Sequence, residues 1–336
     1  MLLKRTIRLG FCLLLFILAP GCSADEWGPL TEGLQPDVDL SPDDQTLLFS
    51  YAFDQTAAVY TADLHGKHIK RLTPSSDSSF VQPVFSPDGR KIAMIRKRGN
   101  NEQILCIMNR DGSGLKALTD KLDGLVTDLA FSRDGRYLYF AKAYDLSVDT
   151  ESPVLYHIFR IHPDGTGLEM VTRQKEYELR SLAVSADDQT LYYVTGQTDD
   201  DDLPRLKVVP IAHPEKAHFL VPKGKREDPS VNDVELSPSG NWLVFTGIAE
   251  IKDGLPKYEQ YLMNMKTKET KRISFLRSET GSAVFFHKKN QVLFTEDINW
   301  NRTGPDSPPP EYKVWITDFS GLHQKSIPLH VPLPER

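Results

Sequence analysis

The stretch Phe85-Ser-Pro-Asp-Gly-Arg-Lys-Ile-Ala-Met94 decides the fold of this 336-residue chain, because the same phrase recurs along the sequence. Ser86 suits the first corner of a type I turn, and Pro87 has the φ angle that the second corner requires. The Asp-Gly pair completes the turn, and the apolar residues on both sides are typical of strands. The phrase therefore predicts a tight β-hairpin.

The phrase has further copies, of which the last is degenerate. All copies can be aligned on the serine or on the residue that replaces it. The aligned positions are Ser41, Ser86, Ser132, Ser185, Ser237 and His287. The steps between them run from 45 to 53 residues. Steps of this size, with four strands in each, are typical of β-propeller blades. We therefore expect an all-β fold, a six-bladed β-propeller with four antiparallel strands per blade.

Each repeat also carries a second turn signal and a common ending. In the second repeat we expect strands at residues 81–85, 91–96, 103–109 and 115–118, with an Asp-Gly turn before the fourth strand and a closing Leu-Thr. The same division places the blades at residues 34–74, 80–120, 125–173, 178–222, 229–275 and 281–328. For ring closure, either the sixth blade is self-contained, or residues 26–34 or the tail adds a strand. The prolines of both segments favour extended linker.

In this order the residues resemble the TolB-like propeller repeat family. The matching stretches of the second repeat are residues 85–89, 104–109, 111–112 and 118–119, and the resemblance covers about residues 34 to 327. It implies the propeller fold, which hosts many functions. No stretch before Pro36 is long enough for the α/β domain that precedes the propeller in TolB itself, so the resemblance does not carry the Tol–Pal role.

The N-terminus reads as an export signal. Lys4, Arg5 and Arg8 precede an apolar run at residues 11–19, which is far shorter than the ~20 residues that a membrane-spanning helix needs. Residues 18–22 resemble a bacterial lipobox, whose Cys22 would be lipidated, for example by palmitate, and become the mature N-terminus. The alternative is ordinary signal cleavage beside an incidental cysteine. We expect a signal at residues 1–21, a spacer at 22–33, the propeller at 34–328 and a tail at 329–336, in a protein anchored to a bacterial membrane by its lipid.

Composition excludes some classes of function. The formal charge of −6 becomes more negative once three basic signal residues are removed, so a nucleic-acid partner is not expected. Cys12 leaves with the signal and Cys22 would be acylated, which leaves Cys106 in an apolar strand as a buried, unpaired residue. The fold must therefore be stable without disulfides.

The lengths of the loops distinguish the two faces of the ring. The connections between first and second strands and between third and fourth strands are short and lie on one face, whereas the long connections between second and third strands lie on the other. Extra loop length collected on one face of a repeat array often marks a binding face. The candidate binding residues on that face are Tyr144, Asp145, Glu250, Lys257, Asn299, Trp300, Arg302 and Tyr312.

Each candidate has a plainer interpretation. Trp300, beside Arg302 on a long loop, suits a ligand platform or a protein hot spot, but packing of its own loop explains it more simply. The acidic run at residues 199–202 could bind calcium, yet a solvated acidic turn fits better because no ligand loop surrounds it. The histidines are scattered, and no nucleophile elbow is present. We therefore expect no metal, no cofactor and no catalytic residue.

The sequence favours a non-catalytic binding or scaffold module of the cell envelope, whose partner is an envelope protein or a small ligand. The alternative is an enzyme, a lyase or hydrolase, acting on a sugar or another small ligand in the axial pocket. Several blades can direct polar groups to the axis without any local motif.

Overall fold

A computed structural model of the chain describes residues 30–332, apart from residues 100–101, 123, 145–154, 174–175, 177, 197–203, 225–229, 253 and 301–306. The described residues form 24 strands and one short 3-10 helix, η1 (Pro214–Lys216). No helix in these ranges has the length and apolarity needed to cross a membrane. The expected all-β fold is confirmed.

Four sheets each contain four antiparallel strands in chain order. The first sheet consists of β1 (Gly33–Leu40), β2 (Thr46–Phe53), β3 (Thr56–Asp63) and β4 (Lys70–Arg71). The second consists of β5 (Ser78–Phe85), β6 (Lys91–Arg98), β7 (Glu102–Asn109) and β8 (Lys116–Ala117). The third consists of β9 (Val126–Phe131), β10 (Leu138–Tyr144), β11 (Leu155–Ile161) and β12 (Glu169–Met170). The fourth consists of β13 (Arg180–Val184), β14 (Thr190–Thr195), β15 (Arg205–Pro210) and β16 (His218–Phe219).

The remaining eight strands form one sheet. Its first half consists of β17 (Val234–Leu236), β18 (Trp242–Lys252), β19 (Leu255–Asn264) and β20 (Thr270–Arg272). Its second half consists of β21 (Glu279–Phe285), β22 (Gln291–Asp297), β23 (Tyr312–Asp318) and β24 (Gln324–Ile327). Strands within each half pair antiparallel, and a single parallel pairing of Tyr258 with Glu279 joins the halves.

This arrangement corrects the expectation of six separate blades, because the structure has four four-stranded blades and one eight-stranded sheet. The physical reason is the length of the β18–β19 hairpin, whose strands have 11 and 10 residues. The hairpin brings the start of β19 beside β21, where the N–H of Tyr258 donates to the carbonyl of Ser278 at 3.0 Å.

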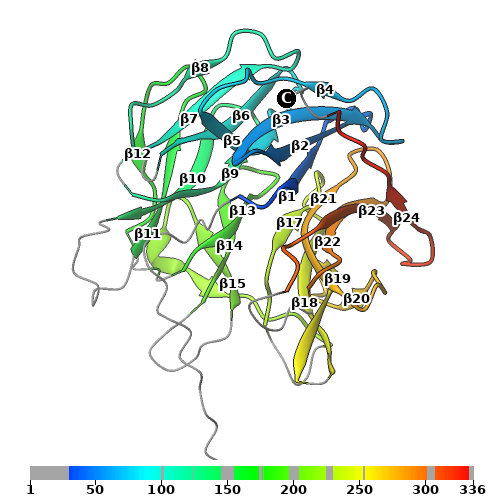
Figure 1. The fold of residues 1–336 in the computed structure, drawn as a ribbon. Coiled ribbons are helices and arrows are strands. Elements are labelled where there is room, and N and C mark those ends of the chain that lie inside the picture. The colour runs from blue at the N-terminus through cyan, green and yellow to red at the C-terminus, as the bar shows by residue number, and fades with distance from the viewer. Residues whose placement is uncertain are drawn as a thin grey trace, which may run out of the picture.

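The sheets are arranged as the blades of a β-propeller (Figure 1). The first strands β1, β9, β13, β17 and β21 lie near the centre, and the short fourth strands lie at the rim. The first sheet, drawn in blue, lies beside the last strands, drawn in orange and red, so the two ends of the described chain meet around the ring.

The motif serine is the centre of the turn between the first and second strands. Ser86 Oγ donates to Asp88 Oδ1 at 2.6 Å and accepts a hydrogen bond from the N–H of Lys91 at 2.9 Å. Gly89 has a φ of +67°, a conformation that favours glycine. The same pair of contacts recurs at Ser41, Ser132 and Ser185. The recurring phrase is therefore explained by turn structure.

The threonine that follows the fourth strand accepts a hydrogen bond from the backbone of its own sheet. Thr119 Oγ1 accepts a hydrogen bond from the N–H of Leu105 at 3.2 Å, and Thr172 Oγ1 accepts one from Ile158 at 2.9 Å. These hydroxyls satisfy backbone donors of the third strand that lie beyond the two-residue fourth strand. Since a buried unpaired N–H costs ~1–3 kcal/mol, the closing threonine holds the outer edge of its sheet.

Neighbouring blades meet through the turn between the third and fourth strands. A Cβ added at Gly112 would lie 2.9 Å from the carbonyl oxygen of Leu72 in the preceding sheet. Gly66 lies against the carbonyl oxygen of Pro328 so closely that a side chain would not fit. Each of these turns therefore contacts the end of the preceding blade. The turn of the first blade contacts the end of the last sheet, which closes the ring.

The seam between the first and last sheets is closed by side chains. Asp44 is 2% exposed, and its carboxylate accepts hydrogen bonds from the N–H groups of His287 at 2.7 Å and Lys288 at 2.8 Å. Beside it, Leu47 and Phe49 of β2 share one apolar cluster with buried residues of the last sheet. Within the described ranges no strand of the first sheet pairs with the last sheet, and β24 is the last strand.

Candidate functional site: the axial cavity

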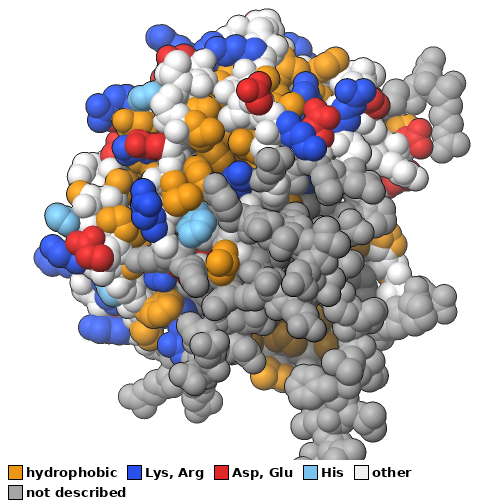
Figure 2. Space-filling view, turned by 90° about the vertical axis from the view of Figure 1, so that its left-hand side faces the viewer, with side chains coloured by type: hydrophobic (Ala, Val, Ile, Leu, Met, Phe, Trp, Pro, Cys, Tyr) orange, Lys and Arg blue, Asp and Glu red, His pale blue; other side chains and the backbone are white. Residues whose placement is uncertain are grey.

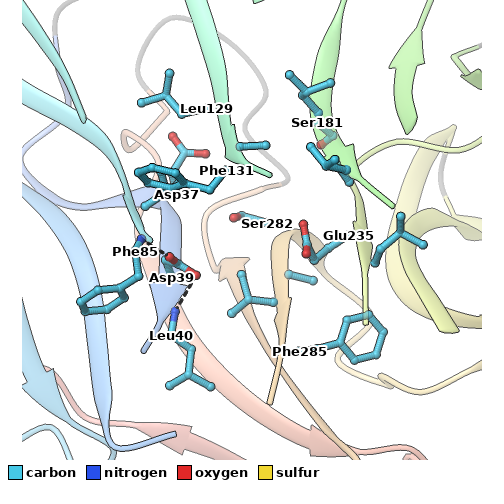
Figure 3. A pocket seen from close by; sticks show the side chains of 18 of the residues that line it. Asp37, Asp39, Leu40, Phe85, Leu129, Phe131, Ser181, Glu235, Ser282 and Phe285 are labelled. Carbon is cyan, nitrogen blue, oxygen red and sulfur yellow. Dashed lines mark hydrogen bonds between the residues drawn. The ribbon is translucent and has the colours of Figure 1, made fainter. Parts of the chain in front are cut away.

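A cavity of about 220 Å³ lies at the centre of the ring. It is lined by residues of the first strand of every repeat, and Figure 3 shows several of their side chains around the opening between the strands. Its lining also includes Pro42, Pro87 and Pro238, which belong to the tight turns after β1, β5 and β17. The cavity therefore extends toward the face that carries the short turns.

A bulge interrupts the first strands at the level of the cavity. The pairing of β5 with β6, for example, shifts between Val81 and Val84. Gln82, Asp128 and Ser181, which occupy equivalent places, have φ angles of +50°, +54° and +56°. A bulge turns a side chain out of the regular alternation of a strand. These three residues line the cavity, and none of them is a glycine that would adopt such a φ without strain.

The bulged residues form a chain of hydrogen bonds from blade to blade. Gln82 Oε1 accepts from the N–H of Asp128 at 3.2 Å, and Asp128 Oδ1 accepts from the N–H of Ser181 at 2.7 Å. Ser181 Oγ then donates to Asp233 Oδ1 at 3.0 Å. Asp37, on β1, completes the set through its hydrogen bond with Gln82. This polar ring holds the side chains in fixed positions around the axis.

A second layer of acidic side chains lies two residues further along the strands. Asp39 accepts hydrogen bonds from the N–H groups of Leu40 at 2.7 Å and Phe85 at 2.6 Å, drawn as dashed lines in Figure 3. Glu235, from β17, lines the same cavity. Its Oε1 lies 3.8 Å from an Arg133 guanidinium nitrogen, which also donates to the carbonyl of Leu236 at 2.9 Å. Arg133 therefore offsets part of the negative charge.

The environment of the first layer disfavours negative charge. Burial, followed by the negative charges of Asp128 and Asp233, raises the pKa of Asp37 from 3.8 to about 7. Burial also raises the pKa of Asp128 to about 6. Lys97, which attracts Asp37 electrostatically, has its own pKa lowered to about 7 by burial. The pKa of Asp37 is thus raised into the neutral range.

The second layer behaves in the same way. Burial raises the pKa of Asp39 to about 6 despite its two backbone hydrogen bonds. Burial raises the pKa of Glu235 to about 7, against the attraction of Arg133. Carboxyl groups of this kind can bind cations or hydrogen-bond donors, and they repel anions. In the described part of the chain no group of three or more His, Cys, Asp or Glu side chains is placed to hold a metal ion.

The residues predicted for the long-loop face are only partly brought together. Lys257 Nζ lies 3.5 Å from Glu250 Oε1 and 5.5 Å from the centre of the Trp300 ring. Lys257 is only 7% exposed. Trp300 is thus held against β19 by a cation–π contact, which agrees with the simpler interpretation that it packs its loop.

Other predicted residues have local roles or lie outside the described ranges. Asn299 Nδ2 donates to the carbonyl of Pro309 at 2.9 Å, and its N–H donates to Asp297 Oδ1 at 3.0 Å, which ties the loop together. Tyr312 begins β23 and Tyr144 ends β10. Cys22, Asp145, Arg302 and the acidic run at 199–202 lie outside the residues that the structure describes.

The axial acids are absent from the residues predicted from the sequence, although the repeat contains a signal for them. Five polar residues lie four positions before the aligned motif position: Asp37, Gln82, Asp128, Ser181 and Asp233. Asp39 and Glu235 lie two positions before it. Aligning the repeats on the serine and reading these columns would have identified the ring.

No family model and no curated protein matches the chain. Three solved structures resemble its fold. TolB from Acinetobacter baumannii has a TM-score of 0.62 at 15% identity, over 88% of this chain and 63% of that one. Putative TolB from Agrobacterium tumefaciens has a TM-score of 0.55 at 16% identity, over 72% and 81% of the two chains. An oligogalacturonate lyase in complex with manganese has a TM-score of 0.55 at 15% identity, over 88% and 80%.

The chain thus spans less than two thirds of the A. baumannii protein. At these identities the likeness concerns the fold, because propellers of one architecture host unrelated functions. The comparisons and the sheet arrangement together show that this chain is an all-β propeller with four-stranded antiparallel blades, similar in fold to TolB-type propellers.

Proposed function

We propose that the protein is a non-catalytic binding module of the cell envelope, in which the ring is a rigid scaffold and the axial cavity is the ligand site. The observation that carries this proposal is the convergence of polar side chains from the first strand of every repeat on one cavity. Pockets with a few convergent polar groups and shifted pKa values are the usual sites of ligand binding. The long-loop face is the competing location.

The alternative is an enzyme acting on a sugar or another small ligand in the same cavity. Raised pKa values at Asp37 and Glu235 favour it, because a general acid must hold a proton near neutral pH. Against it, Asp39 and Asp128 accept backbone N–H groups. Carboxylates committed to the scaffold in this way are suited to fixing a ligand's position, so binding is the better-supported function.

We also propose that the ring has six functional blades, with the eight-stranded sheet counted as two. Each half of that sheet has four antiparallel strands in chain order, and only one residue pair joins the halves. On this count the propeller occupies residues 34–328, between a spacer at 22–33 and a tail at 329–336. The signal at 1–21 precedes them.

Lipid anchoring at Cys22 is the proposed link to a membrane. When the full chain is expressed in a bacterium, Cys22→Ser is expected to move the protein from the membrane fraction to the soluble fraction of the envelope, since it loses the acylated thiol. Fractionation followed by mass measurement of the mature N-terminus tests this. Cys12→Ser, inside the signal, is the matched control and should leave the anchor intact. A Cys22→Ser protein that stays in the membrane fraction would contradict the proposal.

The ligand site is tested by filling the cavity. Ser282 lines the cavity, and Ser282→Phe places a ring in it. A second variant shortens residues 299–311 to a glycine-serine turn and so removes the long-loop candidates. Both soluble proteins and the wild type are incubated with envelope extract and re-purified, and retained molecules are identified by native mass spectrometry.

We expect the wild type and the loop variant to retain the same ligand and Ser282→Phe to lose it. Retention by Ser282→Phe with loss in the loop variant would assign binding to the long-loop face instead. Retention of nothing by the wild type would also count against the proposal. Thermal unfolding of all three proteins verifies that they are folded.

A further inference from the structure

The lining of the axial cavity has more acidic than basic side chains, although Lys97, Arg133 and Arg180 each attract one of the acids. Five acidic side chains line it: Asp37, Asp39, Asp128, Asp233 and Glu235. Arg133 is the basic side chain in the lining that pairs with one of them, at 3.8 Å from Glu235. An anionic ligand would add to this repulsion, so the cavity excludes acidic sugars and phosphates as ligands.

The described residues on the side of the molecule drawn in Figure 2 have a different character. Figure 2 shows basic, acidic and apolar side chains interspersed on one side of the molecule, without a large area of a single sign. Opposite charges that share a solvated surface largely offset each other. Among the described side chains of that face, the carboxyl groups are not concentrated in one place as they are at the axis.

The walls of the cavity are partly aromatic. Phe85, Phe131 and Phe285 line it together with aliphatic side chains. In Figure 3 Asp39 and Glu235 reach toward the same space, whereas the rings of Phe85 and Phe285 point away from it, into the apolar clusters between blades. Phe131, which is only partly buried, is the aromatic side chain of the lining that lies closest to the acids in Figure 3. An aromatic face beside carboxylates suits an organic ammonium group, which gains both an ion pair and a cation–π contact.

The acids form two layers along the axis. Asp37 and Asp39 are two residues apart on β1, which corresponds to about 7 Å along an extended strand. Glu235 belongs to the layer of Asp39, because both lie two residues before the motif serine. A ligand with two positive charges separated by a chain of about four methylene groups would place one charge in each layer.

We propose that the axial cavity binds an organic dication, an aliphatic diamine with one ammonium group at the layer of Asp37, Asp128 and Asp233 and the other at the layer of Asp39 and Glu235. This inference rests on the proposed function, because it takes the cavity as the ligand site. The ammonium groups would replace the protons that the crowded carboxyl groups otherwise retain. The methylene chain would pack against Phe131 and the aliphatic side chains of the lining.

The chemistry favours a diamine over a metal ion. A cavity of about 220 Å³ is several times the ~30 Å³ that one water occupies in the liquid, so an ion would leave much of it filled with solvent. Several carboxylate oxygens are already engaged with the backbone, as at Asp39 and Asp128. Within the described residues no side-chain cluster has the arrangement of a metal site.

Isothermal titration calorimetry at pH 8 and low salt tests the inference on the soluble domain from Ser23 onward. The probes are 1,4-diaminobutane, 1-aminobutane, 1,4-butanediol, succinate and calcium chloride. We expect 1,4-diaminobutane to bind with a Kd below about 1 mM and at least about tenfold more tightly than 1-aminobutane. The neutral diol and the dianion should give no binding.

Isosteric neutral variants locate the site. Asp37→Asn and Glu235→Gln, one from each layer, are each expected to weaken diamine binding at least about tenfold. Asp54→Asn removes a carboxylate from the exposed turn between β2 and β3 and is the matched control, which should bind like the wild type. Equal weakening by Asp54→Asn would mean that the diamine responds only to net charge, and would overturn the inference.

The remaining outcomes separate the inference from the proposed function. Calcium binding as tight as diamine binding, abolished by the same variants, would overturn the inference in favour of a metal site. If no diamine binds while the wild type still retains an extract ligand that Ser282→Phe loses, the inference fails and the proposed function stands. If an axial variant does not fold, the order of affinities of the five probes for the wild type tests the inference: any order in which 1,4-diaminobutane is not bound most tightly overturns it.

Discussion

The Asp37→Asn protein is expected to be more stable than the wild type at pH 8, by up to about 4 kcal/mol. The value follows from the rise in the pKa of Asp37 from 3.8 to about 7, since each unit corresponds to ~1.4 kcal/mol. A carboxyl with a raised pKa binds more protons in the folded than in the unfolded state. Its ionisation therefore lowers the free energy of unfolding as pH rises from about 4 to about 7.

The asparagine removes this penalty and keeps the shape of the side chain and its contact with Gln82. At pH 4, where the aspartic acid is largely protonated in the folded protein, the two proteins should have nearly equal stability. Urea denaturation at pH 4, 6 and 8 measures the difference, with Asp54→Asn as the control that should follow the wild type. A destabilised Asp37→Asn protein at pH 8, or an equal shift at every pH, would contradict the charge assignment.

The groups that set this pH dependence come from several strands. Asp128 and Asp233 oppose the ionisation of Asp37, whereas Lys97 and Gln82 favour it. In the second layer, Asp39 opposes the ionisation of Glu235 and Arg133 favours it. Because these groups titrate together, the contribution of Asp37 measured alone will be smaller than the full value when a neighbour is protonated. Side chains that bind a ligand often lower the stability of the ligand-free protein, so that substituting them raises the free energy of unfolding.

Asp44→Ala is expected to lower the free energy of unfolding by about 3 kcal/mol, because it leaves two backbone N–H groups at the seam without their acceptor. The donors are those of His287 and Lys288, and Asp44 is nearly fully buried. Its φ of +61° adds strain for an alanine. Urea denaturation measures the loss.

Asp44→Gly separates the two causes, since glycine adopts a positive φ freely. We expect it to lose about 2 kcal/mol, which is the part that belongs to the hydrogen bonds. Asp188→Ala provides the comparison away from the seam, because Asp188 accepts the N–H groups of Arg133 at 2.5 Å and Asp134 at 3.0 Å with a φ of +57°. A wild-type stability for Asp44→Gly would show that the seam does not depend on this carboxylate.

The sequence predicted the strands and turns because each is determined locally. Ser86 and Gly89 have the side chain and the φ that the turn requires, and the expected strands of the second repeat agree with β5 to β7 within a few residues. The joining of two blades into one sheet was not predictable, since it depends on a single pairing of Tyr258 with Glu279 between distant segments.

The candidate site shows the limit of pattern reading more clearly. Loop length predicted Trp300 and Lys257 as binding residues, but these two side chains contact each other and fix the loop of Trp300 against β19. Asp128, by contrast, stands in a strand that reads as ordinary alternation, and its bulge turns it to the axis. A positive φ at a non-glycine residue has no signature within a single strand, so only the column of polar residues across the aligned repeats indicates this position in the sequence.

The contact of Gly66 with Pro328 has a consequence for the order in which the molecule can be made. Gly66 belongs to the earliest sheet, and the carbonyl on which its turn rests is among the last residues of the chain. The first blade therefore lacks its neighbour until the residues around Pro328 have been synthesised. A chain of this design remains open while it emerges from the ribosome, and the ring closes only when the last sheet has folded beside the first.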